Sequence, residues 1–301
     1  MEKISVIVPV YNRLEHLRSL IICLIKQEAQ PYELIISDDG SSQDVMDFIK
    51  DLIPKIKFKV KYVRQSDLGF RKTRALNNGV KHSEGEILVF CDQDLIFPPD
   101  YLKVIKENIN KKIFLMSRPI SVTQEEKNKI LEDLNFGKNY SELLKYLPKQ
   151  YSDIERWILR KDFFRRILNK LKLNKRGIRL VGMSYALYKE NYIAVNGYDE
   201  KYRGWGLEDD DFGNRLYVYG IRGKEMKTSL IQMHLYHPFD PTKKQSANEE
   251  YYYIRKKEIF NKKDYFCKYG YNNSYDEDEI LKKQLCGEWY IWRKFYFIQM
   301  E

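Results

Sequence analysis

The first hundred residues alternate short, apolar, β-rich runs with stretches of helical periodicity. This alternation is typical of βαβ units, which assemble into a mostly parallel sheet with helices on its faces. Apolar side chains recur at helical spacing between Leu14 and Ile25, which predicts a helix there with Asn12 as its N-cap. We therefore expect an α/β fold, with strands at residues 4–10, 33–37, 59–63 and 87–91.

Three of the predicted strands run directly into a polar loop. Tyr11 and Asn12 follow the first strand, residues 38–41 (Asp-Asp-Gly-Ser) the second, and residues 92–94 (Asp-Gln-Asp) the fourth. Ligands of open parallel sheets bind outside the carboxyl ends of the strands. We therefore expect the three loops to converge on one site.

Asp92 and Asp94 follow a buried strand and are two residues apart. In extended backbone both carboxylates project to the same side, so they could share one hard divalent cation. Such an ion is a common means of neutralising a diphosphate leaving group. Taken alone, however, a D-x-D pattern is a weak signal, because a solvated acidic turn explains most of its occurrences.

The chain is basic overall, with 53 Lys and Arg against 43 Asp and Glu, a net charge of +10. This charge predicts an anionic partner: a nucleic acid, a membrane surface or a phosphorylated substrate. The excess is concentrated in residues 154–179, which hold ten basic side chains and two acidic ones, Glu155 and Asp162. Charge alone does not choose among the three partners.

The four cysteines are widely spaced and form no C-x-x-C pair, which favours a reducing compartment. The chain contains no apolar run of 18 residues, and its start leads directly into the first predicted strand. We therefore expect a cytoplasmic protein that does not span a membrane.

The loops at Val8–Arg13, Ser37–Ser41 and Asp92–Asp94 together resemble the nucleotide-binding half of the inverting family 2 glycosyltransferases of GT-A fold. The resemblance covers residues 1 to about 105 and implies a UDP-sugar donor. It implies that Asp39 binds the uracil ring, that Asp92 faces the ribose and the metal, and that Asp94 is a direct metal ligand. The remaining donor-binding residues that it implies in these loops are Pro9, Tyr11, Asn12, Arg13 and Gln93.

Asp67 to Lys72 precede a predicted helix, in a pattern that is also seen in this family. We expect Asp67 at the donor site, and Arg71 and Lys72 could reach the base or the phosphates and supply positive charge. A solvated basic helix start explains Arg71 or Lys72 equally well.

A second resemblance begins at Gly182. Residues 182–186, 196–200 and 203–211, the last of them reading RGWGLEDDD, look like the acceptor half of the β1,4-galactosyltransferases and of bacterial chondroitin-type polymerases. The resemblance implies that Asp209 is the catalytic base and that Glu208 helps to hold the acceptor. The acceptor-binding residues would be Ser184, Trp205, Gly206 and Asp210, although Asp210 could instead stabilise the N-terminus of the following helix.

His234 and His237 follow an apolar run. The resemblance implies that His237 completes the metal shell, whereas His234 takes a position that a weaker ligand such as Met occupies in related enzymes. Here Met233 lies one residue earlier, and an ordinary strand histidine remains the alternative for either residue. Oxygen ligands with imidazole suit Mn²⁺, with Mg²⁺ as the other candidate.

These motifs divide the chain into four parts. Residues 1–105 form the nucleotide-sugar-binding half, 106–179 a helical basic segment, 180–240 the acceptor and catalytic half, and 241–301 a C-terminal helical tail. The tail ends with Leu285, Trp289, Trp292 and Tyr296 at helical spacing. The fold that we expect is GT-A: a Rossmann-like mixed central sheet flanked by helices, with a helical insertion and this tail.

We therefore expect an inverting glycosyltransferase that moves a hexose or N-acetylhexosamine from a UDP-sugar to a glycan or lipid-linked glycan, in bacterial surface polysaccharide synthesis. A sugar nucleotidyltransferase is disfavoured because residues 9–12 are not a Gly-rich, Lys-containing loop. A nucleic-acid-binding protein is disfavoured because no recognition module is present, and a non-catalytic sugar-binding relative stays open. The basic segment could bind anionic lipid headgroups or a lipid-diphosphate acceptor, with Trp289, Trp292 and Phe295 at the inner membrane surface. The tail could equally be a helix packed on the body of the protein.

Overall fold

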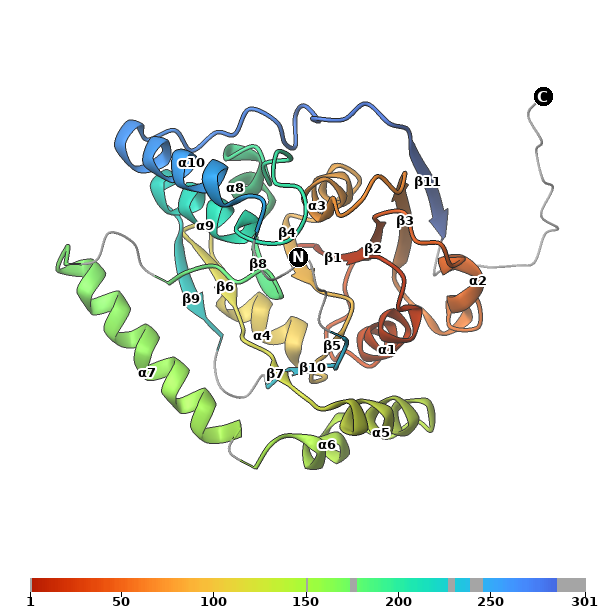
Figure 1. The fold of residues 1–301 in the computed structure, drawn as a ribbon. Coiled ribbons are helices and arrows are strands. Elements are labelled where there is room, and N and C mark those ends of the chain that lie inside the picture. Colours follow the sequence, from red (N-terminus) through yellow and green to blue (C-terminus); the bar gives the residue numbers. More distant parts are fainter. Residues whose placement is uncertain (1, 150, 174–177, 227–230, 239–245, 286–301) are drawn as a thin grey trace, which may run out of the picture.

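An eight-stranded mixed sheet forms the centre of the molecule, with strand order β11-β3-β2-β1-β4-β8-β6-β9 (Figure 1). The computed structural model describes residues 2–149, 151–173, 178–226, 231–238 and 246–285. Neighbours from β3 to β4 are parallel, β8 is antiparallel to both β4 and β6, and β11 is antiparallel to β3. The predicted mixed central sheet flanked by helices is confirmed.

The four strands predicted in the first hundred residues are all present. They are β1 (Ile4–Val10), β2 (Glu33–Asp38), β3 (Lys59–Gln65) and β4 (Ile87–Cys91). The elements between and after them are α1 (Leu14–Ile25), α2 (Val45–Ile49), the 3₁₀ turn η1 (Ile53–Lys55), α3 (Lys72–Lys81), β5 (Leu95–Ile96) and α4 (Tyr101–Asn108).

The predicted cap of α1 is wrong. Arg13, with φ 50°, occupies the N-cap position and makes no capping hydrogen bond with its side chain. The side chain of Asn12 instead accepts hydrogen bonds from the backbone N–H and the hydroxyl of Ser42, both at 3.0 Å. Asn12 therefore ties the first loop to the second, a contact between distant segments that local spacing could not predict.

The basic segment is largely helical, but it also supplies strands. It contains β6 (Ile113–Met116), β7 (Ile120–Ser121), α5 (Gln124–Asn135), α6 (Tyr140–Leu143), the 3₁₀ turn η2 (Leu144–Tyr146) and α7 (Tyr151–Lys170). A capping box between Thr123 and Glu126 starts α5. The strand β6 belongs to the central sheet, so the segment is built into the core and is not a separate helical layer.

The second half of the chain continues the same sheet. It contains β8 (Ser184–Tyr188), α8 (Lys189–Ala194), α9 (Glu208–Tyr219), β9 (Arg222–Glu225), β10 (Met233–His234), α10 (Glu249–Lys262) and β11 (Ile280–Leu285). From α10 the chain crosses the molecule to the opposite edge of the sheet (Figure 1).

The predicted helix at the C-terminus is wrong at its first residue, because Leu285 ends β11 and pairs with Val60 of β3. Trp289, Trp292, Phe295 and Tyr296 lie outside the described residues.

Alternate residues of the central strands point into two apolar cores. Val6 and Val8 of β1 pack with α1, α2 and α4, whereas Ile7 packs with α3, α8 and α9 on the other face. This period of two is the pattern of strands buried on both sides. Cys23, Cys91 and Cys267 are buried free thiols, and no helix in the described ranges is long and apolar enough to cross a bilayer.

Candidate functional site

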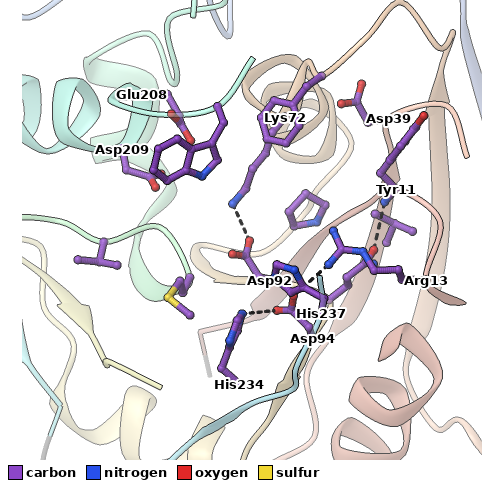
Figure 2. A pocket seen from close by; sticks show the side chains of 17 residues that line it. Tyr11, Arg13, Asp39, Lys72, Asp92, Asp94, Glu208, Asp209, His234 and His237 are labelled. Atoms are coloured by element: carbon purple, nitrogen blue, oxygen red, sulfur yellow. Dashed lines mark hydrogen bonds and ion pairs between the residues drawn. The ribbon is translucent and has the colours of Figure 1, made fainter. Parts of the chain in front are cut away.

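A cavity of about 410 Å³ opens beyond the carboxyl ends of β1 and β4 and reaches the N-terminus of α9 (Figure 2). It brings together segments from both halves of the chain. Thirteen of its seventeen lining residues are ones that the sequence singled out: Pro9, Tyr11, Arg13, Asp39, Lys72, Asp92, Gln93, Asp94, Trp205, Glu208, Asp209, His234 and His237.

Asp94 lies between two histidines at one end of this cavity. Its Oδ1 is 3.5 Å from Nε2 of His234, and its Oδ2 is 3.5 Å from Nε2 of His237. The ligand atoms of the three residues all lie within 4.8 Å of one another. Both nitrogen–oxygen distances exceed an ordinary hydrogen bond, which leaves room for a cation bound to all three.

Strand pairing creates this cluster. Asp94 immediately precedes β5, and the antiparallel pairing of β5 with β10 places His234 opposite Leu95. The backbone N–H of Leu235 then donates to the carbonyl of Asp94 at 2.9 Å. Residues that are about 140 positions apart in the chain are thereby held side by side.

The chemistry of the three residues fits a divalent transition metal. Burial alone would raise the pKa of Asp94, but His234, His237 and Arg13 outweigh it and lower the pKa to about 2. Burial lowers the pKa of His237, which keeps its imidazole neutral near pH 7. Nδ1 of His237 lies 3.0 Å from the carbonyl of Pro238; as a donor there, it leaves the Nε2 lone pair facing Asp94. Oδ1 of Asp94 is buried without a hydrogen-bond partner.

Asp92 lies in a different environment from Asp94, although the two are neighbours in the D-x-D motif. Its Oδ1 accepts a hydrogen bond from Nζ of Lys72 at 2.6 Å, as Figure 2 shows. Burial works against the charge of Lys72, but Asp92, Asp209 and Glu208 outweigh it and raise the lysine pKa. The structure therefore pairs one carboxylate of the motif with an ammonium and the other with imidazoles.

Asp39 lines the opposite end of the cavity and is 5% exposed. Burial raises its pKa to about 6, although it accepts hydrogen bonds from the backbone of Arg71 at 2.7 Å and from Gln65 at 2.5 Å. Each oxygen retains a second lone pair, so Asp39 can still accept a bond from a ligand N–H.

Four other predicted donor residues form or brace the first loop. Gln93 accepts a bond from the N–H of Tyr11 at 3.1 Å and donates to the carbonyl of Asn12 at 3.0 Å. The hydroxyl of Tyr11 donates to Asp67 at 3.3 Å, and the Tyr11 ring is 43% exposed. Asn12 and Asp67 are not among the residues that line the cavity, so they shape the loop from behind.

Arg71 points away from the cavity and is 2% exposed. Its NH1 forms ion pairs with Asp276 and Asp278, both at 2.9 Å, and its NH2 donates to the carbonyl of Ser66 at 2.5 Å. The guanidinium of Arg71, which was predicted to bind the donor, is therefore paired with two acids of the C-terminal segment. Of Arg71 and Lys72, only Lys72 lines the cavity.

Four consecutive acids, Glu208 to Asp211, open α9, and their side chains diverge into different surroundings. Asp211 is fully buried and bonds Nε of Arg215 at 2.7 Å. Asp210 forms an ion pair with Nε of Arg179 at 2.8 Å and accepts from the hydroxyl of Tyr252. Glu208 and Asp209 line the cavity.

Asp209 is held by two donors. Its Oδ1 accepts from the hydroxyl of Tyr198 at 2.8 Å, and its Oδ2 accepts from the backbone N–H of Gly182 at 3.2 Å. A Cβ atom on Gly182 would collide with this carboxylate. The glycine of the predicted acceptor motif is therefore required by close packing against Asp209.

Glu208, unlike Asp209, has a carboxylate oxygen without a hydrogen-bond donor. It is 6% exposed, and its Oε2 is buried without a hydrogen-bond partner. Burial, reinforced by the charge of Asp209 and opposed by Lys72, raises its pKa to about 7. Glu208 can therefore exchange a proton near neutral pH.

A second cavity of about 530 Å³ adjoins the first. The two share Val181, Trp205, Glu208 and Asp209, so the acidic pair lies on the boundary between them. Gly206 and Asp210 line only the second cavity, beside three arginines: Arg118, Arg165 and Arg179. The carbonyl of Trp205 accepts from Ser246 at 2.8 Å and that of Gly206 from Asn248 at 3.0 Å, which anchors the loop.

Ser184 is placed apart from the other predicted acceptor residues. It is fully buried in β8, and its hydroxyl shares a hydrogen bond of 2.7 Å with Tyr101. It is not among the residues that line either cavity.

Four lining residues were not predicted: Val10, Phe70, Val181 and Met183. Phe70 is 42% exposed despite its size, beside the predicted donor residues Arg71 and Lys72. Val10, Phe70 and Met183 lie inside motifs that the sequence singled out, and Phe70, an aromatic residue between a glycine and a basic pair, carried the clearest signal. Val181 lies outside these motifs and carried none.

Comparison with protein families gives two matches. The model of "Glycosyl transferase family 2" matches residues 5–172, which is more than half of the chain. The model described as "N-terminal domain of galactosyltransferase" matches residues 163–238, which include Trp205, Glu208, Asp209 and both histidines.

Curated relatives are polysaccharide synthases and a glucosyltransferase. A hyaluronan synthase of Pasteurella multocida is 26% identical, over 82% of this chain and 26% of the relative. A chondroitin synthase of Escherichia coli is 23% identical, over 82% of this chain and 36% of the relative. A validoxylamine A glucosyltransferase of Streptomyces hygroscopicus subsp. limoneus is 25% identical, over 72% of this chain and 48% of the relative. The chain thus spans about a quarter to a half of the length of these relatives.

Solved structures share the fold. Residues 1–349 of S. aureus TarS in complex with UDP-GlcNAc superpose with a TM-score of 0.54 and 17% identity, over 84% of this chain and 64% of that one. The mannosyltransferase PcManGT of Pyrobaculum calidifontis, in complex with GDP-Man and Mn²⁺, superposes with a TM-score of 0.50 and 16% identity, over 78% of this chain and 56% of that one.

Proposed function

The chain belongs to glycosyl transferase family 2, and we propose that it is a metal-dependent, inverting glycosyltransferase. In this proposal it moves a hexose or N-acetylhexosamine from a UDP-sugar to a hydroxyl of a glycan or lipid-linked glycan. One observation carries the proposal: a cluster suited to a metal and a pair of catalytic carboxylates line the same cavity of about 410 Å³.

The donor binds with its base at the Asp39 end and its diphosphate at the Asp94 end. Asp39 accepts the N–H of the uracil ring, and the exposed ring of Tyr11 forms one wall beside Pro9. This orientation of the donor places the anomeric carbon of its sugar toward Glu208 and Asp209. The solved complexes of the same fold with UDP-GlcNAc and with GDP-Man support a nucleotide-sugar ligand.

Asp94, His234 and His237 would hold the metal, with Asp92 facing it from the ribose side. The bound ion would neutralise the diphosphate as it leaves. A carboxylate with two imidazoles suits Mn²⁺ better than Mg²⁺, which prefers oxygen ligands. Lys72 adds a second positive charge over the same region, so that negative charge developing on the leaving group meets an ammonium held in place by Asp92.

Asp209 takes the proton of the attacking acceptor hydroxyl. Tyr198 and Gly182 hold its two oxygens and leave it facing both cavities, so it can meet an acceptor that enters from the second one. The hydroxyl oxygen then attacks the anomeric carbon on the face opposite the departing phosphate, which inverts that carbon. Glu208, in its protonated form, donates a hydrogen bond that holds the acceptor.

Trp205 separates the two cavities and offers an apolar face for a sugar ring. The polysaccharide-synthase relatives support a glycan acceptor and a role in surface polysaccharide synthesis. We propose that the protein acts in the cytoplasm, peripherally on the inner face of the membrane, and that no nucleic acid binds beyond the nucleotide of the donor.

A panel of UDP-sugars, each incubated with Mn²⁺, Mg²⁺ or a chelator, tests this function through the UDP released by slow donor hydrolysis. We expect release from at least one sugar nucleotide with metal and none with chelator. Absence of metal-dependent release, together with UDP affinity that metal does not increase, would overturn the proposal.

A further inference from the structure

The helix α7 attaches to the body through one narrow stripe. Asp162 is the one fully buried side chain among those of α7 that the structure describes, and it is hydrogen-bonded to Glu225 of β9. Asn169, two turns later, donates to the hydroxyl of Tyr217 of α9 at 2.8 Å. Figure 1 shows the helix at the margin of the molecule, beyond β9.

The opposite side of α7 is exposed and carries a row of large apolar side chains. Trp157, Phe164 and Leu171, the last one residue beyond the end of α7, follow at seven-residue spacing with exposed fractions of 60%, 61% and 62%. Ile167 and Leu168 lie between them, 37% and 41% exposed. At about 100° per residue, these five side chains fall within an arc of about 100° that is centred roughly opposite Asp162 and that also contains Asp153 and Arg160.

Basic side chains flank this apolar face. Residues 151–173 carry seven Lys and Arg against three acids. Arg160 lies within this arc, Arg156 just beyond one edge of it and Lys161 just beyond the other, where the Nζ of Lys161 is 4.4 Å from the centre of the Trp157 ring. A helix with an apolar face, an aromatic residue and basic flanks has the composition of helices that lie in the interface of an anionic bilayer.

We propose that α7 docks this protein on an anionic lipid surface, with Trp157, Phe164, Ile167, Leu168 and Leu171 at the acyl boundary and the basic flanks among the headgroups. Charge complementarity selects this partner, because a second copy would place two positively charged faces against each other. The helix satisfies its own backbone hydrogen bonds, as an apolar boundary requires.

Docking through α7 would also orient the site. Arg165 of α7 lines the second cavity together with Asp209, so a docked helix would hold that cavity beside the lipid surface. A lipid-linked acceptor could then enter without leaving the membrane. This consequence rests on the proposed transferase function, whereas the docking itself does not.

Co-sedimentation with vesicles tests the docking. Vesicles of phosphatidylcholine alone are compared with vesicles of phosphatidylcholine and phosphatidylglycerol, at low and at physiological salt. We expect binding to the anionic vesicles that weakens with salt, and at least about tenfold weaker binding to the neutral ones. Equal binding to both, or binding to neither, would overturn the proposal.

Two variants separate the apolar from the charged contribution. Trp157→Ser with Phe164→Ser, and Arg160→Glu with Lys161→Glu, should each weaken binding to the anionic vesicles by about tenfold or more. The matched control is Phe136→Ser with Tyr253→Ser, which removes two aromatic rings that are 76% and 54% exposed elsewhere on the surface. The inference fails if the control weakens binding as much as either variant.

Two further readouts keep the inference distinct from the proposed function. Metal-dependent UDP-sugar hydrolysis should be unchanged in both variants, because none of the four residues lines either cavity. Sedimentation velocity without vesicles should give a monomer. A dimer that the Trp157 and Phe164 substitutions dissociate would assign the face to self-association and overturn lipid docking.

Discussion

The two acidic motifs of this chain, residues 92–94 and 208–211, look alike in sequence, but their carboxylates have different surroundings in the structure. Asp94 lies among two imidazoles and a guanidinium, and its pKa falls to about 2. Glu208 lies buried with an unpartnered oxygen beside Asp209, and its pKa rises to about 7. The first carboxylate stays ionised at any physiological pH, as a cation site requires, and the second can exchange a proton near neutral pH. The comparison teaches that the neighbours of a carboxylate, more than the motif that contains it, decide its chemistry.

Removal of Asp94, the proposed metal ligand, should have the largest effect on this contrast. Asp94→Ala is expected to abolish metal-dependent binding of UDP, because the two histidines lose the anion between them. Isothermal titration of UDP with Mn²⁺ and with chelator measures the loss. Asp47→Ala, at an exposed acid that lines neither cavity, is the control and should bind UDP as the unaltered protein does.

Removal of the carboxylate of Asp209, the proposed base, should separate the roles of the two motifs. Asp209→Asn preserves the shape of the side chain and should leave metal-dependent UDP binding intact, while transfer falls by about 10²- to 10⁴-fold. The measurement is sugar transfer beside UDP titration on the same preparation. Equal loss of donor binding in Asp209→Asn and Asp94→Ala would contradict the separate roles assigned to the two carboxylates.

A variant that displaces the Asp209 carboxylate without removing its charge should sharpen the contrast further. Gly182→Ala places a Cβ against the Asp209 carboxylate, which must then move. A displacement on the order of 1 Å should lower transfer by about 10²-fold and leave UDP affinity with Mn²⁺ unaltered. Steady-state transfer and UDP titration together check this, and wild-type transfer in this variant would show that the contact is unimportant.

The raised pKa of Glu208 should appear as a pH dependence of stability. The folded protein keeps the proton up to about pH 7, whereas the unfolded chain releases it near 4.5, so the folded state binds more protons between these values. The contribution of Glu208 to the free energy of unfolding is therefore greatest below pH 4.5. It falls by about 3 kcal/mol at most as the pH rises to 7, and it is constant above pH 7.

Glu208→Gln removes that fall and should be more stable than the unaltered protein at pH 8 but not at pH 4.5. Urea unfolding at the two pH values measures the difference. An equal change in the free energy of unfolding at both would show that Glu208 ionises normally.

Much of the donor half was predictable because its determinants are local. The strands β1 to β4 and helix α1 follow from apolar periodicities of two and 3.6 residues, and each polar loop follows a strand end. The acidic pair Asp92 and Asp94 could be seen at once. The resemblance then supplied distant members of the site, since spacing alone does not connect Asp94 with His234 or His237.

The errors arose where a distant segment competes for a side chain. Arg71 was expected at the donor, but Asp276 and Asp278 bind its guanidinium. Asn12 was expected to cap α1, but Ser42 takes its side-chain oxygen. In each case the expected role was chemically reasonable, and the missing partner lay between 30 and 207 residues away.

By itself the sequence determined the α/β pattern, the loops that end the strands and the acidic residues available for metal and proton chemistry. Only the tertiary structure decided which carboxylate meets which neighbour. The pairing of β5 with β10 brings His234 to Asp94, and the packing of α9 against Gly182 and Tyr198 orients Asp209 and leaves Glu208 buried. The physical reason is that backbone periodicity is set by neighbouring residues, whereas burial and charge at a site depend on segments that meet only when the chain is folded.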